Sequence, residues 1–546
     1  MHYLSLENTF VIMKKAISLN ILMLLLTIQV LGRDCAPNKN NQHFNVLHYA
    51  LVLKFDTATA HITGNVTMKA VCTATPKNEL EVSLQEPMMM ERVVSNQQML
   101  KFRKKDEKYY ISHPNLRIGD TFSITMYYSG IPRMAENAPW QGGLVKSRDA
   151  QGRSWLAMAC QAEGASLWFP CKDMLSDEPE EGVELYYTVP EGVVAVGNGR
   201  LINVRPVADK HNLWHWRVQA PINLYNITFN IGHFIRIQEE MKSKAGMLNL
   251  DYYVMSENFT KARAHFATVP EMISIFEDWL GAYPFFNDGF KLVETPYLGM
   301  EHQSAVAYGN QYQNGYMGKD RSGSGVGLLF DFILVHESAH EWFGNNISVN
   351  DPAYYWIHEG FTSYAEVLYI ESKHGRQQAM NYLIGTRKLI QNKAPMQGTQ
   401  KHLCSNDNSD IYPKGAQLVH LIRLMMQNDE TFKQMLKDLN NVFSRKVCSG
   451  EEIESFLIAQ SGLPLQAVFN QYLRQKEIPQ LLVERTAEGF QYQWQHCLAD
   501  FEMPVLLLID NEPVWLQAST RKQDYYKPKL NTVSLHPEYY CDLELK

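Results

Sequence analysis

Two histidines and two glutamates near the middle of the chain have the spacing of a metal site. His336-Glu337-Ser338-Ala339-His340 places two imidazoles four residues apart, and Glu359 follows the second one after 18 intervening residues. Residues four apart share one face of a helix, so both rings can reach the same cation. A second, antiparallel helix would bring Glu359 back as a third ligand, and Glu337 can hold a water beside the metal. We therefore predict one catalytic zinc ion on His336, His340 and Glu359.

The alternative for this motif is a pair of surface histidines on an amphipathic helix, because a motif this short also arises by chance. The apolar run at residues 329–335 instead favours a buried helix, and buried imidazoles need polar partners. A metzincin site requires glycine at 343 and histidine at 346, where this chain has Phe343 and Asn346. The third ligand is thus predicted to be a carboxylate, as in thermolysin-type sites.

The sequence around these residues resembles the M1 family of zinc aminopeptidases. The resemblance covers residues from about 42 to the C-terminus and consists of ordered motifs. These are Gln161 ahead of Phe169-Pro170-Cys171-Lys172-Asp173, Gly299-Met300-Glu301-His302, His336 to Asn345, Trp356-Ile357-His358-Glu359-Gly360-Phe361, and Tyr412-x-Lys414-Gly415-Ala416. The resemblance implies an aminopeptidase that hydrolyses the N-terminal residue from peptides with a free N-terminus.

The resemblance also assigns roles, which the chemistry of each side chain allows. Glu337 is expected to be the general base, and Tyr412 to donate a hydrogen bond to the developing oxyanion. Glu301 and Gln161 are expected to bind the α-ammonium of the substrate. Alone, Tyr412 would be a tyrosine packed at a helix start, and Gln161 an ordinary loop amide.

Three neighbours of Glu301 complete the predicted substrate-binding motif: Gly299, Met300 and His302. His302 stands where the family usually has asparagine, and we expect it to keep a hydrogen-bonding role. Glu366 lies seven residues after Glu359, so it falls on the same helical face and is predicted to orient a ligand histidine. The alternative for Glu366 is a solvated helix carboxylate.

Composition and charge limit the classes of partner. The chain has 546 residues, 45% hydrophobic, and a formal net charge of −7, which argues against a nucleic-acid-binding protein. Lys14-Lys15 followed by the apolar run 17–30 predicts a signal peptide over residues 1–33, with an uncleaved anchor as the alternative. We therefore expect a bacterial protein that is exported to the periplasm or secreted, with no stable membrane insertion after signal removal.

The hydrophobic pattern predicts a multi-domain α+β chain. Period-two alternation between residues 44 and 235 indicates antiparallel strands, as in Tyr49, Leu51, Leu53 and Phe55. Helical periodicity follows, with one helix expected over 327–345, and strands return after Pro479. The predicted domains are an N-terminal β-domain (34–240), a mostly helical thermolysin-like domain (241–477) and a small β-sandwich (478–546). Many family members have a large helical C-terminal domain, which this sequence lacks, so a more open active site is expected.

Three other functions compete with an aminopeptidase. A thermolysin-type endopeptidase would share the zinc motif, but Glu301 and Gln161 argue against it. A binding or scaffold protein without activity is disfavoured because every expected catalytic residue is present. Hydrolysis of a lipid epoxide, known in one branch of the family, has no specific support in the sequence.

Overall fold

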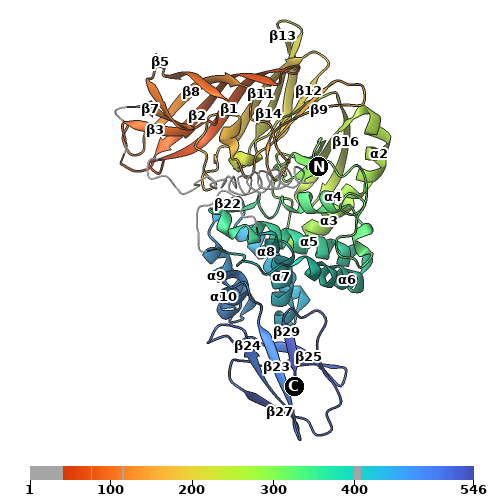
Figure 1. Ribbon diagram of the computed structural model, residues 1–546. Coiled ribbons are helices and arrows are strands. Elements are labelled where there is room, and N and C mark those ends of the chain that lie inside the picture. The colour runs from red at the N-terminus through yellow and green to blue at the C-terminus, as the bar shows by residue number, and fades with distance from the viewer. Residues whose placement is uncertain (1–40, 76, 114–115, 399–407) are drawn as a thin grey trace, which may run out of the picture.

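The computed structural model describes residues 41–75, 77–113, 116–398 and 408–546. The predicted signal peptide, residues 1–33, lies outside these ranges. Within them, no helix is both long and apolar enough to cross a membrane. Figure 1 shows a β-rich region at the top, a helical region in the middle and a smaller β-rich region at the bottom. The predicted α+β fold class is confirmed.

The N-terminal region consists of three sheets whose strands alternate between buried and exposed residues. In β1, Tyr49, Leu51, Leu53 and Phe55 are buried, while Val52 and Lys54 face solvent, as a half-buried strand requires. The largest sheet has the order β13-β14-β11-β1-β2-β8-β4-β5, with β1 and β11 parallel. Its strands are β1 (Phe44–Asp56), β2 (His61–Cys72), β4 (Met89–Ser95), β5 (Gln98–Met99), β8 (Thr121–Gly130), β11 (Val183–Pro190), β13 (Arg200–Val207) and β14 (His211–Val218). The smaller sheets contain β3 (Glu79–Ser83), β6 (Phe102–Lys105) and β7 (Lys108–Ser112), and β9 (Gly143–Arg148), β10 (Ser154–Ala159), β12 (Val194–Val196) and β15 (Asn230–Gly232).

The middle region joins a mixed five-stranded sheet to a group of helices. The sheet order is β16-β17-β18-β20-β19, from β16 (Phe234–Ser243), β17 (Gly246–Met255), β18 (Phe290–Glu294), β19 (Gly299–Met300) and β20 (Val306–Tyr308). The helices are α2 (Phe259–His265), α3 (Val269–Leu280), α4 (Phe332–Ala339), α5 (Trp356–His374), α6 (Arg376–Thr386), α7 (Pro413–Met426), α8 (Asp429–Val442), α9 (Gly450–Ser461) and α10 (Gln466–Arg474). A short parallel pair, β21 (Ile347–Val349) and β22 (Lys446–Cys448), lies beside them. The predicted boundary at 240/241 falls inside β16, and the one at 477/478 falls between α10 and β23.

Helix α4, which carries the zinc motif, is much shorter than the helix expected over 327–345. The helix begins after Asp331, whose carboxylate accepts a hydrogen bond from the backbone N–H of Leu334 at 3.0 Å and so caps it. It ends at Ala339, and the chain then turns through Gly344, which has a φ of 112°. The expected length was wrong because an apolar run does not show where capping and turn residues interrupt a helix.

The C-terminal region consists of two small sheets that share a core with the helices. Their orders are β27-β24-β23-β29 and β26-β25-β28. The strands are β23 (Gln480–Thr486), β24 (Gly489–Gln495), β25 (Val505–Ile509), β26 (Glu512–Leu516), β27 (Gln523–Tyr526), β28 (Val533–Leu535) and β29 (Asp542–Leu545). One continuous cluster of buried apolar side chains includes residues of α5, α7 and α10 and of these strands.

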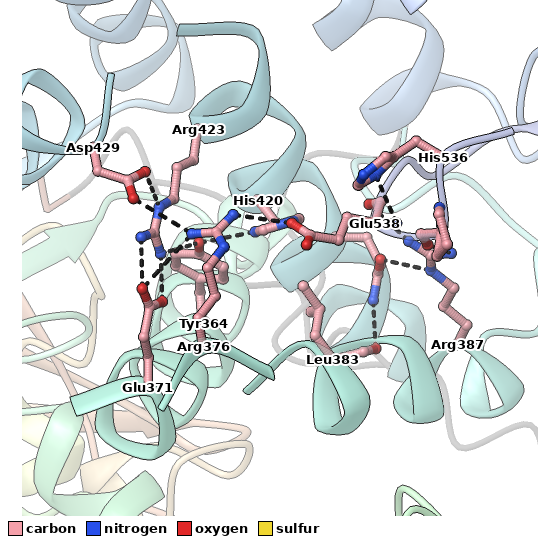
Figure 2. A network of polar contacts seen from close by, with 12 residues as sticks. Tyr364, Glu371, Arg376, Leu383, Arg387, His420, Arg423, Asp429, His536 and Glu538 are labelled. Atoms are coloured by element: carbon pink, nitrogen blue, oxygen red, sulfur yellow. Dashed lines mark hydrogen bonds and ion pairs between the residues drawn. The ribbon is translucent and has the colours of Figure 1, made fainter. Parts of the chain in front are cut away.

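A polar network connects the C-terminal region to the helices (Figure 2). The carboxylate of Glu538, which follows β28, accepts a hydrogen bond from Arg376 of α6 at 2.9 Å and lies 3.3 Å from Nε2 of His420 on α7. Arg387 donates to the backbone carbonyl of Glu538 at 2.9 Å. On the other side of His420, Nδ1 is 3.0 Å from the hydroxyl of Tyr364 on α5. The network thus ties three helices of the middle region to the loop between β28 and β29.

Candidate zinc centre and active site

The structure brings the three predicted zinc ligands together around one point. Nε2 of His336 and Nε2 of His340 are 3.3 Å apart, and Oε2 of Glu359 lies 3.4 Å and 3.3 Å from these two nitrogens. Tetrahedral zinc with bonds of about 2.0–2.1 Å holds its ligand atoms about 3.3 Å apart, so the observed spacing suits this ion. Among the described residues, one group of three or more His, Cys, Asp or Glu side chains has its ligand atoms close enough together to hold a metal, and it is this triad.

The hydrogen bonds behind the two histidines leave their Nε2 atoms available to a cation. Nδ1 of His336 donates to Oε1 of Glu366 at 2.7 Å, and Nδ1 of His340 donates to the carbonyl of Phe343 at 2.8 Å. Donation from Nδ1 places the lone pair on Nε2, which is the form that binds metal. Glu366 is itself fixed by the hydroxyl of Tyr382, which donates to Oε2 at 2.6 Å. Glu366 is therefore buried behind a ligand histidine and is not a solvated surface carboxylate.

The electrostatics of the triad also indicate a bound positive charge. Burial by itself lowers the pKa of His336, but the hydrogen bonds to Glu359 and Glu366 outweigh burial and raise the pKa to about 10. Burial raises the pKa of Glu359, yet the nearby His340 and His336 bring it well below its ordinary value. The triad therefore favours a positive charge between its members, and a divalent metal could supply that charge without protonating the ligands.

Glu337 projects into the same cavity, next to the triad. Gly299 on β19 makes room for it, because a Cβ at position 299 would lie 2.6 Å from Cγ2 of Ile333 and 3.1 Å from Oε1 of Glu337. Burial raises the pKa of Glu337 to about 7, with the histidines opposing that rise. A carboxyl group with a pKa near neutrality can both accept and return a proton, as a general base requires.

Tyr412 lies at the N-terminus of α7, with its ring stacked against His336 at a centroid distance of 5.9 Å. Burial and the negative charges of neighbouring glutamates raise its pKa well above the ordinary value, so the hydroxyl stays protonated and can donate. The position of α7 is set by a backbone contact with α5. A Cβ on Gly415 would lie 2.7 Å from Cα of Gly360, and one on Gly360 would lie 2.9 Å from Cα of Gly415.

Glu301 and Gln161 meet across the boundary between the N-terminal and middle regions, although 140 residues separate them. Nε2 of Gln161 donates to Oε1 of Glu301 at 2.5 Å, and the hydroxyl of Tyr225 donates to the same oxygen at 3.2 Å. Burial raises the pKa of Glu301, and among the surrounding charges His340 acts most strongly to lower it. This places a buried carboxylate, oriented by two donors, on the His340 side of the triad.

His302 does not have the role expected from the sequence. Its ring is fully buried, neither ring nitrogen has a hydrogen-bond partner among the described residues, and it does not line the active-site cavity. Burial lowers its pKa to about 3, so the ring is neutral. The expectation of a hydrogen-bonding role is therefore wrong: the side chain points into the protein interior, whereas its neighbours Gly299, Met300 and Glu301 line the cavity.

The cavity that contains these groups has a volume of about 470 Å³ and reaches the surface at Trp140, which is 54% exposed. The sequence did not point to two polar residues of its lining, Tyr355 and Arg321. It also gave no indication of Tyr225, which donates a hydrogen bond to Glu301 from outside the lining. None of them belongs to a short motif. Tyr355 directly precedes α5, and its place next to Trp356 was the one local signal that could have found it.

Comparisons with known proteins agree with this geometry. Residues 266–472 match the model of the peptidase family M1 domain. The chain is 21% identical over 453 residues to aminopeptidase N of Lactococcus lactis, covering 77% of this chain and 51% of that protein. It is 21% identical over 303 residues to human endoplasmic reticulum aminopeptidase 1, covering 53% of this chain and 30% of that protein. The chain thus spans about half or less of the length of these curated relatives.

Solved structures show the same fold. The M1 zinc metallopeptidase from Deinococcus radiodurans aligns with a TM-score of 0.66 at 20% identity, covering 82% of this chain and 98% of that one. Aminopeptidase A of Legionella pneumophila aligns with a TM-score of 0.75 at 14% identity, covering 94% of this chain and 61% of that one.

The fold and the site define a candidate zinc centre in which the two histidines of an HExxH helix and a glutamate from the following helix could hold the metal. The middle region of the chain, residues 266–472, thus matches the peptidase family M1 domain, and the chain shares its fold with solved M1 zinc metallopeptidases.

Proposed function

We propose that this protein is a zinc aminopeptidase that hydrolyses the N-terminal residue from peptides with a free N-terminus. The proposal depends mainly on the position of Glu301 in the metal cavity, held by Gln161 and Tyr225. A carboxylate at this place can pair with an α-ammonium group. The distance between that pair and the triad then fixes which peptide bond reaches Glu337.

Each side chain has a step that its position allows. Bound at the triad, zinc supplies a Lewis acid for a peptide carbonyl and lowers the pKa of a water. Glu337 takes a proton from the attacking water and delivers it to the leaving amine. The protonated hydroxyl of Tyr412 donates to the oxyanion as charge develops, a contact worth about 2.7–4 kcal/mol in comparable sites. Glu301 and Gln161 hold the substrate's amine throughout.

The test uses the zinc-loaded protein with paired peptides that differ only in a free or an N-acetylated terminus. We expect loss of the first residue from the free peptide alone, and no cleavage after zinc is chelated, with product masses as the readout. Glu301→Gln keeps the shape of the side chain but removes its charge. It should lower kcat/KM by about 10- to 100-fold, since a hydrogen bond to a charged group contributes about 1.5–3 kcal/mol.

The main competing outcome is internal cleavage. If the acetylated peptide is cut as fast as the free one, Glu301 is not an amine anchor and the protein is an endopeptidase of thermolysin type. If zinc binds at the triad but neither peptide is cleaved, the protein is a binding protein that retains the site.

We also propose that the protein is exported to the periplasm or secreted. The support is the sequence of residues 1–33, in which Lys14-Lys15 precedes an apolar run and the small residue Gly32. The test is N-terminal sequencing of the protein from fractionated bacterial cells. A mature N-terminus near residue 33 in the exported fraction is expected, and an intact N-terminus in the cytoplasmic fraction would contradict export.

A further inference from the structure

Arg321 is the one lysine or arginine among the described residues that line the active-site cavity. It lies in the glycine-rich loop 318–327, directly before the helix that carries the zinc motif. The acidic side chains in the lining are Glu301, Glu337 and Glu359. A single guanidinium in such a cavity is electrostatically distinct from the rest of the wall.

The guanidinium of Arg321 contacts two aromatic rings and has no acidic partner among the described residues. Its Cζ atom lies 5.0 Å from the centroid of the Tyr316 ring and 5.3 Å from that of Phe332, so it is stacked against both. In the described part of the chain, no carboxylate forms an ion pair with it. The adjacent Asp320 is occupied by the loop itself, since it accepts from the backbone N–H groups of Ser322 at 2.8 Å and Gly325 at 2.6 Å.

Arg321 and Glu301 lie on different sides of the triad. Arg321 stacks on Phe332, and the Phe332 ring stacks on His336 with a centroid distance of 5.2 Å and an interplanar angle of 13°. Glu301 instead lies with Gln161 and Tyr225 beyond the other end of α4, where the side chain of Asn345 donates to its backbone carbonyl at 2.8 Å. The cavity therefore has a negative group at one end, the metal site between, and a positive group at the other end.

The separation suits a short peptide. An extended chain advances about 3.3–3.6 Å per residue, so the two ring contacts between Arg321 and His336 together span the length of about two or three residues. A peptide with its ammonium at Glu301 and its first peptide bond at the triad would thus bring a carboxylate to Arg321 only if it ends soon after that bond. Guanidinium is well suited to this partner, because its two parallel N–H groups match the geometry of a carboxylate.

We propose that Arg321 binds the C-terminal carboxylate of the substrate and makes the enzyme selective for peptides of three or four residues. This inference rests on the proposed aminopeptidase function and adds the substrate class. The cavity thus recognises both charged ends of a short zwitterionic peptide: Glu301 binds the ammonium group, and Arg321 binds the carboxylate.

The experiment compares the zinc-loaded protein and its Arg321→Leu variant on Leu-Gly-Gly and on the same tripeptide with a C-terminal amide. The unmodified enzyme should favour the free acid by about tenfold in kcat/KM, a moderate value for a charge pair at a solvent-accessible site. Arg321→Leu should lose this preference by slowing cleavage of the acid while leaving the amide within about twofold. Arg321→Lys, which keeps the charge but not the paired N–H groups, should fall between. The matched control is Arg263→Leu, an exposed arginine on α2 that does not line the cavity.

The outcomes separate this inference from the proposed function. The role of Arg321 would be overturned if the unmodified enzyme cleaved the tripeptide acid and the tripeptide amide at equal rates, or if Arg321→Leu slowed cleavage of both substrates equally. Either result would still be compatible with aminopeptidase activity. A hexapeptide should show no acid preference, and a preference of the same size there would also overturn the assignment. If no peptide loses its first residue, the proposed function fails. Calorimetric binding of the two tripeptides to zinc-loaded Glu337→Gln, with and without Arg321→Leu, then still decides whether Arg321 recognises the carboxylate.

Discussion

Replacing Glu366 with glutamine should weaken zinc binding without removing any ligand. Oε1 of Glu366 accepts from Nδ1 of His336 at 2.7 Å, and Oε2 accepts from Tyr382 at 2.6 Å. Glutamine has one acceptor and one donor group in this position, so it cannot accept from both neighbours. It also lacks the negative charge that makes the imidazole a stronger ligand.

The expected size of the effect follows from the loss of this support. Removing a hydrogen-bonded carboxylate behind a ligand histidine lowers metal affinity by about 10- to 100-fold, which corresponds to about 1.4–2.7 kcal/mol. The measurement is competition for zinc against a chelating dye of known affinity, with the metal-free protein and each variant. Tyr382→Phe is the matched control, because it removes the other hydrogen bond to Glu366 but leaves the carboxylate in contact with His336, and it should change the affinity by less than threefold.

Two results would refute the reasoning about Glu366. If Glu366→Gln binds zinc as tightly as the unmodified protein, the carboxylate does not tune the ligand. If Tyr382→Phe weakens binding as much as Glu366→Gln, the effect comes from packing around α6 and not from the charge beside His336.

Three further changes test the stability of the fold. Burial opposes ionisation of Glu538, but His420 and Arg376 outweigh it and lower the pKa of Glu538 to about 2. Because solvent partly screens this network, Glu538→Gln should destabilise the protein at pH 7 by about 2 kcal/mol, which is less than the full shift implies. Because the folded pKa is lower than the unfolded one, this contribution is present above about pH 4.5 and is lost as the pH falls toward 2. Burial raises the pKa of Glu178 to about 7, so the folded protein loses stability as the pH rises from about 4.5 to 7. Glu178→Gln removes this ionisation and should therefore stabilise the protein above pH 7 by up to about 3 kcal/mol. Asp331→Asn should cost about 2–3 kcal/mol, because the carboxylate accepts from several donors at the start of α4 and an amide leaves some of them unpaired.

Urea unfolding followed across pH measures all three changes. A difference between Glu538→Gln and the unmodified protein that persists unchanged at pH 3 would contradict the ion-pair argument. For Glu178, equal pH dependence of the variant and the unmodified protein between pH 5 and 8 would show that this carboxyl does not titrate abnormally. For Asp331, Asp524→Asn on the exposed strand β27 is the control, and a loss of stability no larger than the control's would contradict the capping argument.

The sequence predicted the metal triad because its chemistry depends on local periodicity. His336 and His340 are four positions apart, which places both rings on one helical face, and α5 returns Glu359 to them as expected. The alternation in β1 likewise predicted its buried face correctly. Both rules depend on residues close in sequence, where backbone geometry alone decides which side chains are neighbours.

The remainder of the site depends on contacts between distant segments. No periodicity relates Gln161 to Glu301, and the tyrosine that supports them, Tyr225, lies in a third segment. The family resemblance pointed to the first two but gave no indication of the third. It also misled at His302, because a motif records which residue follows Glu301 and not which way its side chain points.

The contact between Gly360 and Gly415 has a consequence for how this site tolerates sequence change. Glu359 precedes one glycine and Tyr412 lies three residues before the other, so a zinc ligand and the proposed oxyanion donor are spaced by two touching backbones. Side chains also join these two helices, as in the contact between Tyr364 of α5 and His420 of α7, but the two glycines allow the backbones to touch beside the catalytic groups. During divergence, any residue larger than glycine at either position would push the two backbones apart and separate the two catalytic groups in a single step.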